Sequence, residues 1–119
     1  MAGGAASAPA DSPSAGSAVD EEHLRRQTMG DRDVERQALI LFRDNASAAL
    51  VAIANAGRMA ERCEAAHKLV GAARAIGAWR LAAAAAEIEA SGALTADGVA
   101  VLAATMTEVT DFIAARLAA

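Results

Sequence analysis

Proline is absent from the chain after Pro13, and this absence governs what the remaining residues can form. A proline inside a helix removes a backbone donor and clashes with the preceding turn, so its absence permits long uninterrupted helices. Alanine, the strongest helix former, accounts for 36 of the 119 residues, whereas aromatic residues make up 3%. Aromatic and β-branched residues are the ones that favour strands. We therefore expect an all-α fold in a chain of one domain's length.

The first eighteen residues differ in composition from the rest. Alanine, glycine, serine and proline dominate residues 1–18, and Asp11 is the single charge. This composition has no apolar periodicity around which a core forms. We predict a disordered tail over residues 1–18 and a folded domain over residues 19–119. A short lead-in helix carrying Val19, Leu24 and Met29 is expected to end before Gly30.

Apolar residues three and four apart mark four longer helices. We expect them over 31–57, 58–76, 78–90 and 95–117, with Asp31 and Thr95 as N-caps and with Gly57, Gly77 and Gly92 at the ends of the first three. Short connections predict an antiparallel up-down-up-down four-helix bundle with the lead-in helix at one end. The expected core residues are Val34, Ala38, Leu41, Phe42, Ala49, Ala52, Ile53, Ala56, Met59, Cys63, Ala66, Leu69, Val70, Ala73, Leu81, Ala85, Ile88, Val99, Leu102, Met106, Val109, Ile113 and Leu117.

Charge and composition exclude several classes of function. The formal net charge of -4 disfavours a nucleic-acid partner, which requires a basic surface. No uninterrupted apolar run approaches the roughly 18 residues of a membrane span, and the N-terminus lacks the features of a signal peptide. Cys63 is the single cysteine, so this chain alone forms no disulfide. We expect a cytoplasmic, monomeric protein that binds neither nucleic acid nor membrane.

The segment from Ala66 to Gly77 holds the candidate site. Each residue of a helix turns the chain by about 100° around the axis. Measured from His67, the apolar residues of this helix centre at about -100°, so His67 lies at the flank of the buried stripe. Gly71, at about +40°, points away from the core although a mid-helix glycine costs about 1 kcal/mol relative to alanine. Clearance beside His67 explains this choice. Arg74, at about -20°, leans back toward His67 and suits phosphate oxygens.

These residues resemble the histidine-containing phosphotransfer (HPt) domains of multistep phosphorelays. The family pattern is a His, one variable residue, Leu, Lys, Gly, two small residues, two variable residues, an aliphatic residue and Gly. The matching residues are His67, Leu69, Gly71, Ala72, Ala73, Ile76 and Gly77, and further similarities are Gly30 with Asp31, Phe42, and Leu81 with Glu87 or Glu89. The resemblance covers roughly residues 19–117. Val70 departs from it, because the family has a lysine there; Lys68 or Arg74 is the candidate substitute.

The resemblance implies a phosphoryl carrier. His67 would accept a phosphoryl group, on Nε2, from the aspartyl phosphate of one receiver domain and pass it to the aspartate of another. The implied partners are the receiver domains of a hybrid histidine kinase and of a response regulator. The chain would need no cofactor, kinase activity or ATP site of its own, since the receiver supplies Mg²⁺. The predicted site residues are His67, Arg74, Lys68 and Gly71.

Three other interpretations compete with this one. The phosphoacceptor domain of a histidine kinase has an acidic residue and an Arg-Thr-Pro turn after its histidine, whereas Lys68 and Leu69 follow here. A non-catalytic adaptor that docks receivers without carrying phosphate remains open because of Val70. Zinc held by Cys63, His67 and His23 lacks a fourth ligand. We expect His23 and Glu64 to be surface residues.

Overall fold

The computed structural model describes residues 17–119, and within this range the chain is all helical. The helices are α1 (Glu21–Gln27), α2 (Arg32–Asn55), α3 (Met59–Ile76), α4 (Trp79–Ser91) and α5 (Ala96–Ala118). The all-α prediction is confirmed, and each expected helix is present. Most of the segment predicted to be disordered, 1–18, lies outside the described residues. Its last residue, Ala18, is half-buried and packs against the core.

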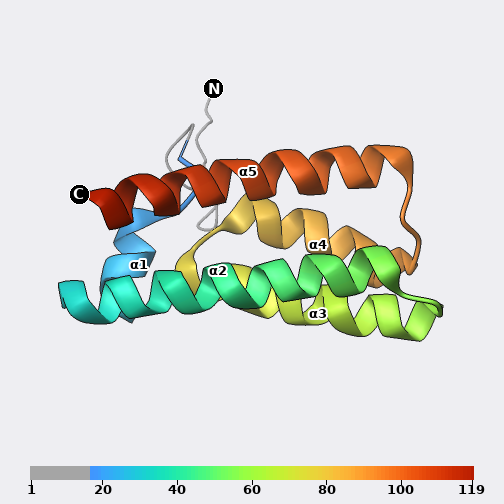
Figure 1. Cartoon of the computed structure of the whole chain (residues 1–119), viewed down its shortest axis with the longest axis horizontal. Coiled ribbons are helices and arrows are strands. Elements are labelled where there is room, and N and C mark those ends of the chain that lie inside the picture. Colours follow the sequence, from blue (N-terminus) through green and yellow to red (C-terminus); the bar gives the residue numbers. More distant parts are fainter. Residues whose placement is uncertain (1–16) are drawn as a thin grey trace, which may run out of the picture.

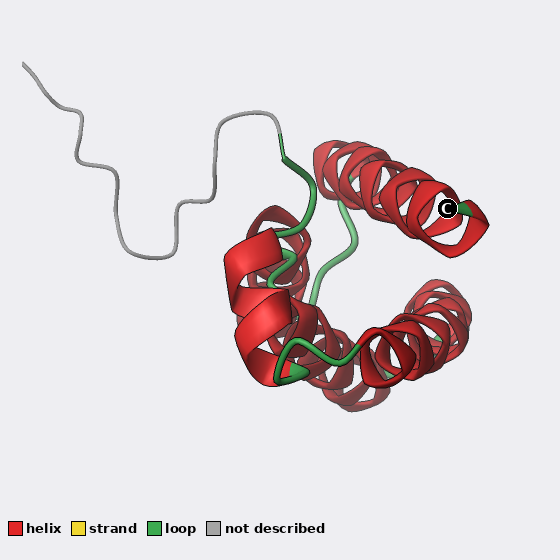
Figure 2. Ribbon diagram, turned by 90° about the vertical axis from the view of Figure 1, so that its left-hand side faces the viewer, coloured by secondary structure: helices red, strands yellow, loops and turns green. Residues whose placement is uncertain are grey.

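The four longer helices lie side by side, and successive helices run in opposite directions (Figure 1). α3 packs against both α2 and α4, α5 packs against α4, and a smaller contact joins α5 to α2. Seen from the end of the molecule, α1 lies across the long helices (Figure 2), and it contacts α3. A hollow lined by residues of α1, α2 and α3 lies at this end of the bundle.

Four of the five caps that the sequence predicts are present. The Asp31 carboxylate accepts from the backbone N–H groups of Asp33 and Val34, and the Thr95 hydroxyl accepts from that of Gly98. Gly77 and Gly92 adopt left-handed conformations, with φ of 82° and 69°. These caps satisfy backbone groups that a helix terminus leaves unpaired.

The predicted role of Gly57 is wrong. α2 ends at Asn55 and its C-cap, Ala56, is extended. A side chain from α3 caps the helix instead: the Arg62 guanidinium donates to the carbonyl oxygens of Ile53 at 3.3 Å and Ala56 at 3.4 Å. It also donates to Gly92 O, after the end of α4, at 3.3 Å. A cation at two helix C-termini is favoured by the helix dipoles.

Replacing Arg62 with methionine is expected to lower the free energy of unfolding by about 1–2 kcal/mol, because carbonyl groups of two helix ends lose a charged donor. Urea unfolding followed by circular dichroism measures the change. Arg58→Met is the matched control, since Arg58 pairs only with Glu61 at the surface and such pairs contribute less than about 1 kcal/mol. Equal losses for the two variants would contradict the capping role.

The buried face of α2 differs from the expected one. Leu41 and Val34 are 61% and 38% exposed, whereas Leu39 and Ala46, which we did not predict, are fully buried. The observed core residues of this helix are Leu39, Phe42, Ala46, Ala49 and Ile53. Alanines lie all around α2, so they do not mark one face of the helix as apolar. The spacing of apolar residues in this helix therefore fits the predicted buried face and the observed one equally well. Val34, Ala38 and Leu41 instead line a hollow beside α1.

The other helices follow their expected core more closely. In α3 and α5 the residues near the first turn are exposed, because the bundle ends there: Met59 is 62% and Val99 45% exposed. Met29 lies outside α1, has a positive φ of 55° and is 85% exposed, so its predicted place in the lead-in helix is wrong. Leu24 of the lead-in helix is buried. The predicted core residues that are buried in the other helices are Ala66, Leu69, Val70, Ala73, Leu81, Ala85, Ile88, Leu102, Met106, Val109 and Ile113.

A cluster of polar groups fixes α1 to the turn between α3 and α4. Asp20 caps α1 by accepting from the backbone N–H of His23, and its other oxygen accepts from Trp79 Nε1 at 3.0 Å. The His23 ring meets the Trp79 ring edge-on at 4.9 Å between centroids and is half-buried, so its predicted surface position is wrong. Gly77 must remain glycine, because a Cβ there would lie 3.0 Å from Asp20 Cβ.

The pKa of the Asp20 carboxyl lies below its usual value of 3.8, chiefly because Trp79 donates a hydrogen bond to it. A pKa lowered by folding means that the carboxylate stabilises the fold above pH 3.8, and that this contribution is lost as the pH falls through the lowered pKa. When the pH is lowered from about 5 to about 2.5, we expect the free energy of unfolding to fall less for Trp79→Phe than for the wild type. Urea unfolding at the two pH values tests this, and equal losses would contradict it.

Two helices, α2 and α5, are long and apolar enough to cross a membrane by length and composition. Each supplies residues to the core of the folded chain. Each also carries charges in its middle, Arg43 and Asp44 in α2 and Glu108 in α5, which are costly in a bilayer. The composition of these two helices is therefore weak evidence for a membrane segment.

Candidate functional site

The imidazole of His67 protrudes from the middle of α3. Its neighbours Ala66 and Leu69 are fully buried, whereas the His67 side chain is 73% exposed. The buried stripe of α3 thus fixes the backbone beneath the ring, and the ring itself stands in solvent. An exposed imidazole on a rigid helix suits a reaction with another macromolecule.

One ring nitrogen of His67 is held by a carboxylate from the neighbouring helix. His67 Nδ1 lies 2.7 Å from Glu89 Oε2 on α4. A carboxylate only accepts hydrogen bonds, so Nδ1 carries the proton in this contact. In the neutral ring the lone pair is then on Nε2, the nitrogen farther from Glu89. The contact therefore fixes both the tautomer and the orientation of the ring.

Gly71 leaves open space one turn after His67. A Cβ built at Gly71 meets no atom within 4 Å. A close helix crossing therefore does not explain this glycine, and the predicted clearance at this position is present. The open surface would admit the side chains of another protein beside the histidine.

The two predicted cations, Lys68 and Arg74, lie on different sides of His67. Arg74 is exposed in the last turn of α3, about 20° from His67 around the helix and about 10 Å along it. Lys68 lies about 100° around the helix and lines a hollow between α3 and α2. Val70, where the family has lysine, is 5% exposed and belongs to the core.

Among residues 17–119 the polar contact recorded for the His67 ring is the one with Glu89, so the remaining candidates, Glu64 and Cys63, do not hold the ring. Glu64 is exposed and lines the same hollow as Lys68, as expected for a surface residue. Cys63 packs near Gly92, where a built Cβ would lie 3.3 Å from its sulfur. Across residues 17–119 no three His, Cys, Asp or Glu side chains gather as a metal ion requires.

Glu89 is the site residue that sequence reasoning did not single out. The sequence contains two acidic residues, Glu87 and Glu89, in the second half of α4, and both fit the family pattern. Only the rotation of α4 against α3 decides which of them reaches His67. The signal in the sequence is therefore a pair of candidates, and the packing of the two helices selects one.

The sequence around this site matches a known protein family. The family model described as Hpt domain matches residues 37–116, which is more than half of the chain and includes His67 and Glu89. Searches of curated proteins and of solved structures give no match. Hpt domains work with the receiver domains of phosphorelay proteins, and the family is typically soluble. The chain belongs to the Hpt domain family and takes part in two-component phosphorelay signalling.

Proposed function

We propose that His67 carries a phosphoryl group from the aspartyl phosphate of one receiver domain to the aspartate of another. The observation that carries the proposal is the exposed ring of His67 with its Nδ1 held by Glu89. This contact leaves the Nε2 lone pair free for attack. The functional unit in this proposal is an antiparallel bundle of α2 to α5, with α1 across one end.

The transfer follows from this arrangement. Nε2 attacks the phosphorus of the aspartyl phosphate, an N–P bond forms, and the P–O bond breaks to release the carboxylate of the donor. The ring becomes cationic while Nδ1 keeps its proton, and the Glu89 carboxylate stabilises that charge. The second transfer reverses these steps on another receiver. The partner receiver is expected to supply Mg²⁺, which neutralises charge on the moving group.

An apolar hollow that begins on α3 five residues after His67 supports the docking of a receiver. It has a volume of about 280 Å³ and lies between α1, α2 and α3, with Ala72 and Ala75 of α3 in its wall. Leu41 and Val34 line it although they are exposed. Exposed apolar groups that line a hollow are typical of a surface that a partner covers.

A transfer assay tests the proposal. A receiver domain from the same genome, phosphorylated on its aspartate, is expected to label this protein at a single site. The label should survive base and be lost in acid, as expected for phosphohistidine. Failure of every receiver in the genome to transfer phosphate would contradict the carrier function.

The alternative function is an adaptor that docks receivers without carrying phosphate. The burial of Val70 favours it, because this chain lacks a lysine ammonium at the position where the family holds the phosphoryl group. In our proposal Arg74 supplies positive charge instead. Binding of a receiver without any transfer of label would support the adaptor. We further propose that the protein is cytoplasmic and monomeric.

Replacing Glu89 with alanine is expected to slow phosphoryl transfer about tenfold, because the ring loses the partner that fixes its orientation and tautomer. Glu89→Gln is the matched comparison: its amide oxygen still accepts from Nδ1 but lacks the carboxylate charge, so this variant should lose less of the rate than Glu89→Ala. Rapid-quench kinetics with a phosphorylated receiver measures both variants. Unchanged transfer by Glu89→Ala would refute the positioning role.

A further inference from the structure

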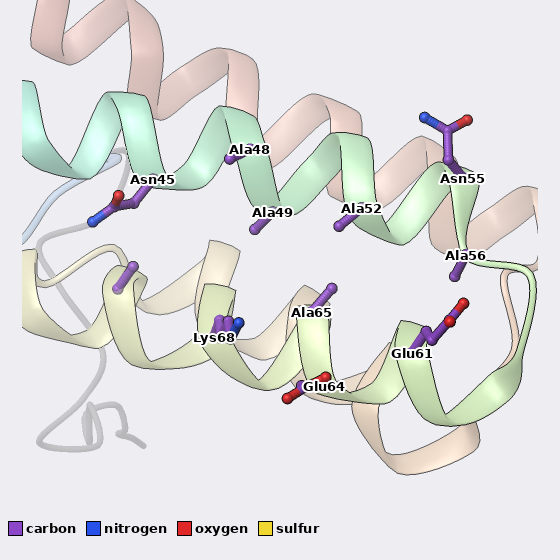
Figure 3. Close-up of a pocket in the computed structure, with 11 residues that line it drawn as sticks. Asn45, Ala48, Ala49, Ala52, Asn55, Ala56, Glu61, Glu64, Ala65 and Lys68 are labelled. Carbon is purple, nitrogen blue, oxygen red and sulfur yellow. The ribbon is translucent and has the colours of Figure 1, made fainter.

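A groove between α2 and α3 is not used by the chemistry described above. It has a volume of about 740 Å³, and alanine side chains from both helices form most of its wall. Figure 3 shows Ala49 and Ala52 of α2 facing Ala65 of α3, with Glu64 and Lys68 on the same stretch of α3. Small side chains keep the groove open, so that larger side chains of a partner can enter it.

This groove continues the apolar hollow beside α1. Asn45 of α2 and Ala72 of α3 line both. Together the two run along α3 from Glu61 to Ile76, a helical rise of about 22 Å. A partner helix of about four turns has this length. An elongated apolar surface between two helices is a common docking site for a helix of another protein.

The groove carries two charges that the protein does not pair internally. A third charged residue of the groove, Glu61, already has partners within the protein: its carboxylate accepts from Gly57 N and pairs with Arg58. Glu64 and Lys68 have no ion-pair partner within residues 17–119, although a Glu followed by a Lys four positions later commonly pairs on a helix. Their charges are therefore available to a partner.

Lys68 also lies on a different side of α3 from His67. Its position, about 100° around α3 from His67, places it at the groove, whereas Glu89 holds the ring from the opposite side, on α4. Lys68 is thus better placed to contact a docked helix than to contact a phosphoryl group. This placement separates its role from that of Arg74, which shares the face of His67.

We infer that Glu64 and Lys68 determine which receiver domain this protein accepts. The occupant of the groove is a helix of the receiver, with a basic side chain opposite Glu64 and an acidic one opposite Lys68. Complementary charges of this kind select partners and oppose the docking of wrong ones. The inference rests on the proposed function for the identity of the partner, but it concerns docking and not the transfer step.

The test exchanges the two charges in the double variant Glu64→Lys/Lys68→Glu, which keeps the net charge. The probe is the receiver domain from the same genome that binds the wild type most tightly. We expect its Kd, and the KM for transfer, to rise about tenfold or more, with kcat changed less than about twofold. Reversing the facing charges on the receiver helix should restore the Kd. Arg80→Glu/Glu108→Arg is the matched control, since this exposed pair joins α4 to α5.

The outcomes separate this inference from the carrier function. An unchanged Kd, or a loss confined to kcat, would overturn the role of Glu64 and Lys68 in selection. A change in self-association of the variant, measured by sedimentation, would show that a second copy fills the groove and would also overturn it. If the wild type binds receivers but transfers no phosphate, the carrier function fails, and the Kd of the charge exchange still decides the inference.

Discussion

His67→Gln is expected to abolish the phosphate label that a phosphorylated receiver transfers to this protein. The glutamine amide resembles the imidazole in polarity, but its nitrogen has no lone pair available to attack phosphorus. The side chain is 73% exposed, so the substitution removes little packing. The fold, measured by circular dichroism and unfolding, should therefore remain intact while transfer falls below detection.

His23→Gln is the matched control for this loss. His23 is the other histidine of the chain and lies beside Trp79, on α1. The variant should still accept the label, although its α1 contact is weakened. Label on His67→Gln at the wild-type level would contradict the assignment of His67. Loss of label from His23→Gln with a native fold would indicate that α1 takes part in the transfer.

Gly71→Leu is expected to slow transfer about tenfold or more while the fold is retained. The added side chain projects into the open surface beside His67, where a Cβ meets no atom of the protein within 4 Å. It therefore obstructs a partner and not the bundle, and a displacement of about 1 Å at a reacting group costs much of the rate. The measurement is the transfer rate from a phosphorylated receiver under single-turnover conditions.

Two variants separate obstruction from a change in the helix. Gly71→Ala should raise the free energy of unfolding by about 0.5–1 kcal/mol through helix propensity and leave transfer nearly unchanged. Ala103→Leu places a leucine at an exposed position of α5, away from α3, and should also leave transfer unchanged. Equal rates for Gly71→Leu and the wild type would show that no partner approaches this surface.

The helices and their caps could be predicted because local residues determine them. Asp31 and Thr95 cap their own helices, and Gly77 ends α3 in the left-handed conformation that suits glycine. The exposed position of His67 follows in the same way from the 3.6-residue period of α3. These features need no knowledge of how the helices pack together.

The features that could not be predicted depend on helix packing. Arg62 caps α2 from α3, and Glu89, which contacts His67 from α4, lies 22 residues after it in the sequence. Alanine contributes to this difficulty, since it is compatible with buried and exposed positions alike. For this reason the sequence pattern places Leu41 in the core, whereas Leu41 is 61% exposed in the structure.

The most direct test of the central claim is to identify the nitrogen that carries the phosphate. Protein labelled with ¹⁵N is phosphorylated by a receiver, and the imidazole nitrogens are assigned by two-dimensional proton–nitrogen correlation. We expect phosphate on Nε2 of His67, with a proton on Nδ1 held by Glu89. Phosphate on Nδ1 of His67, or on any other residue, would contradict it.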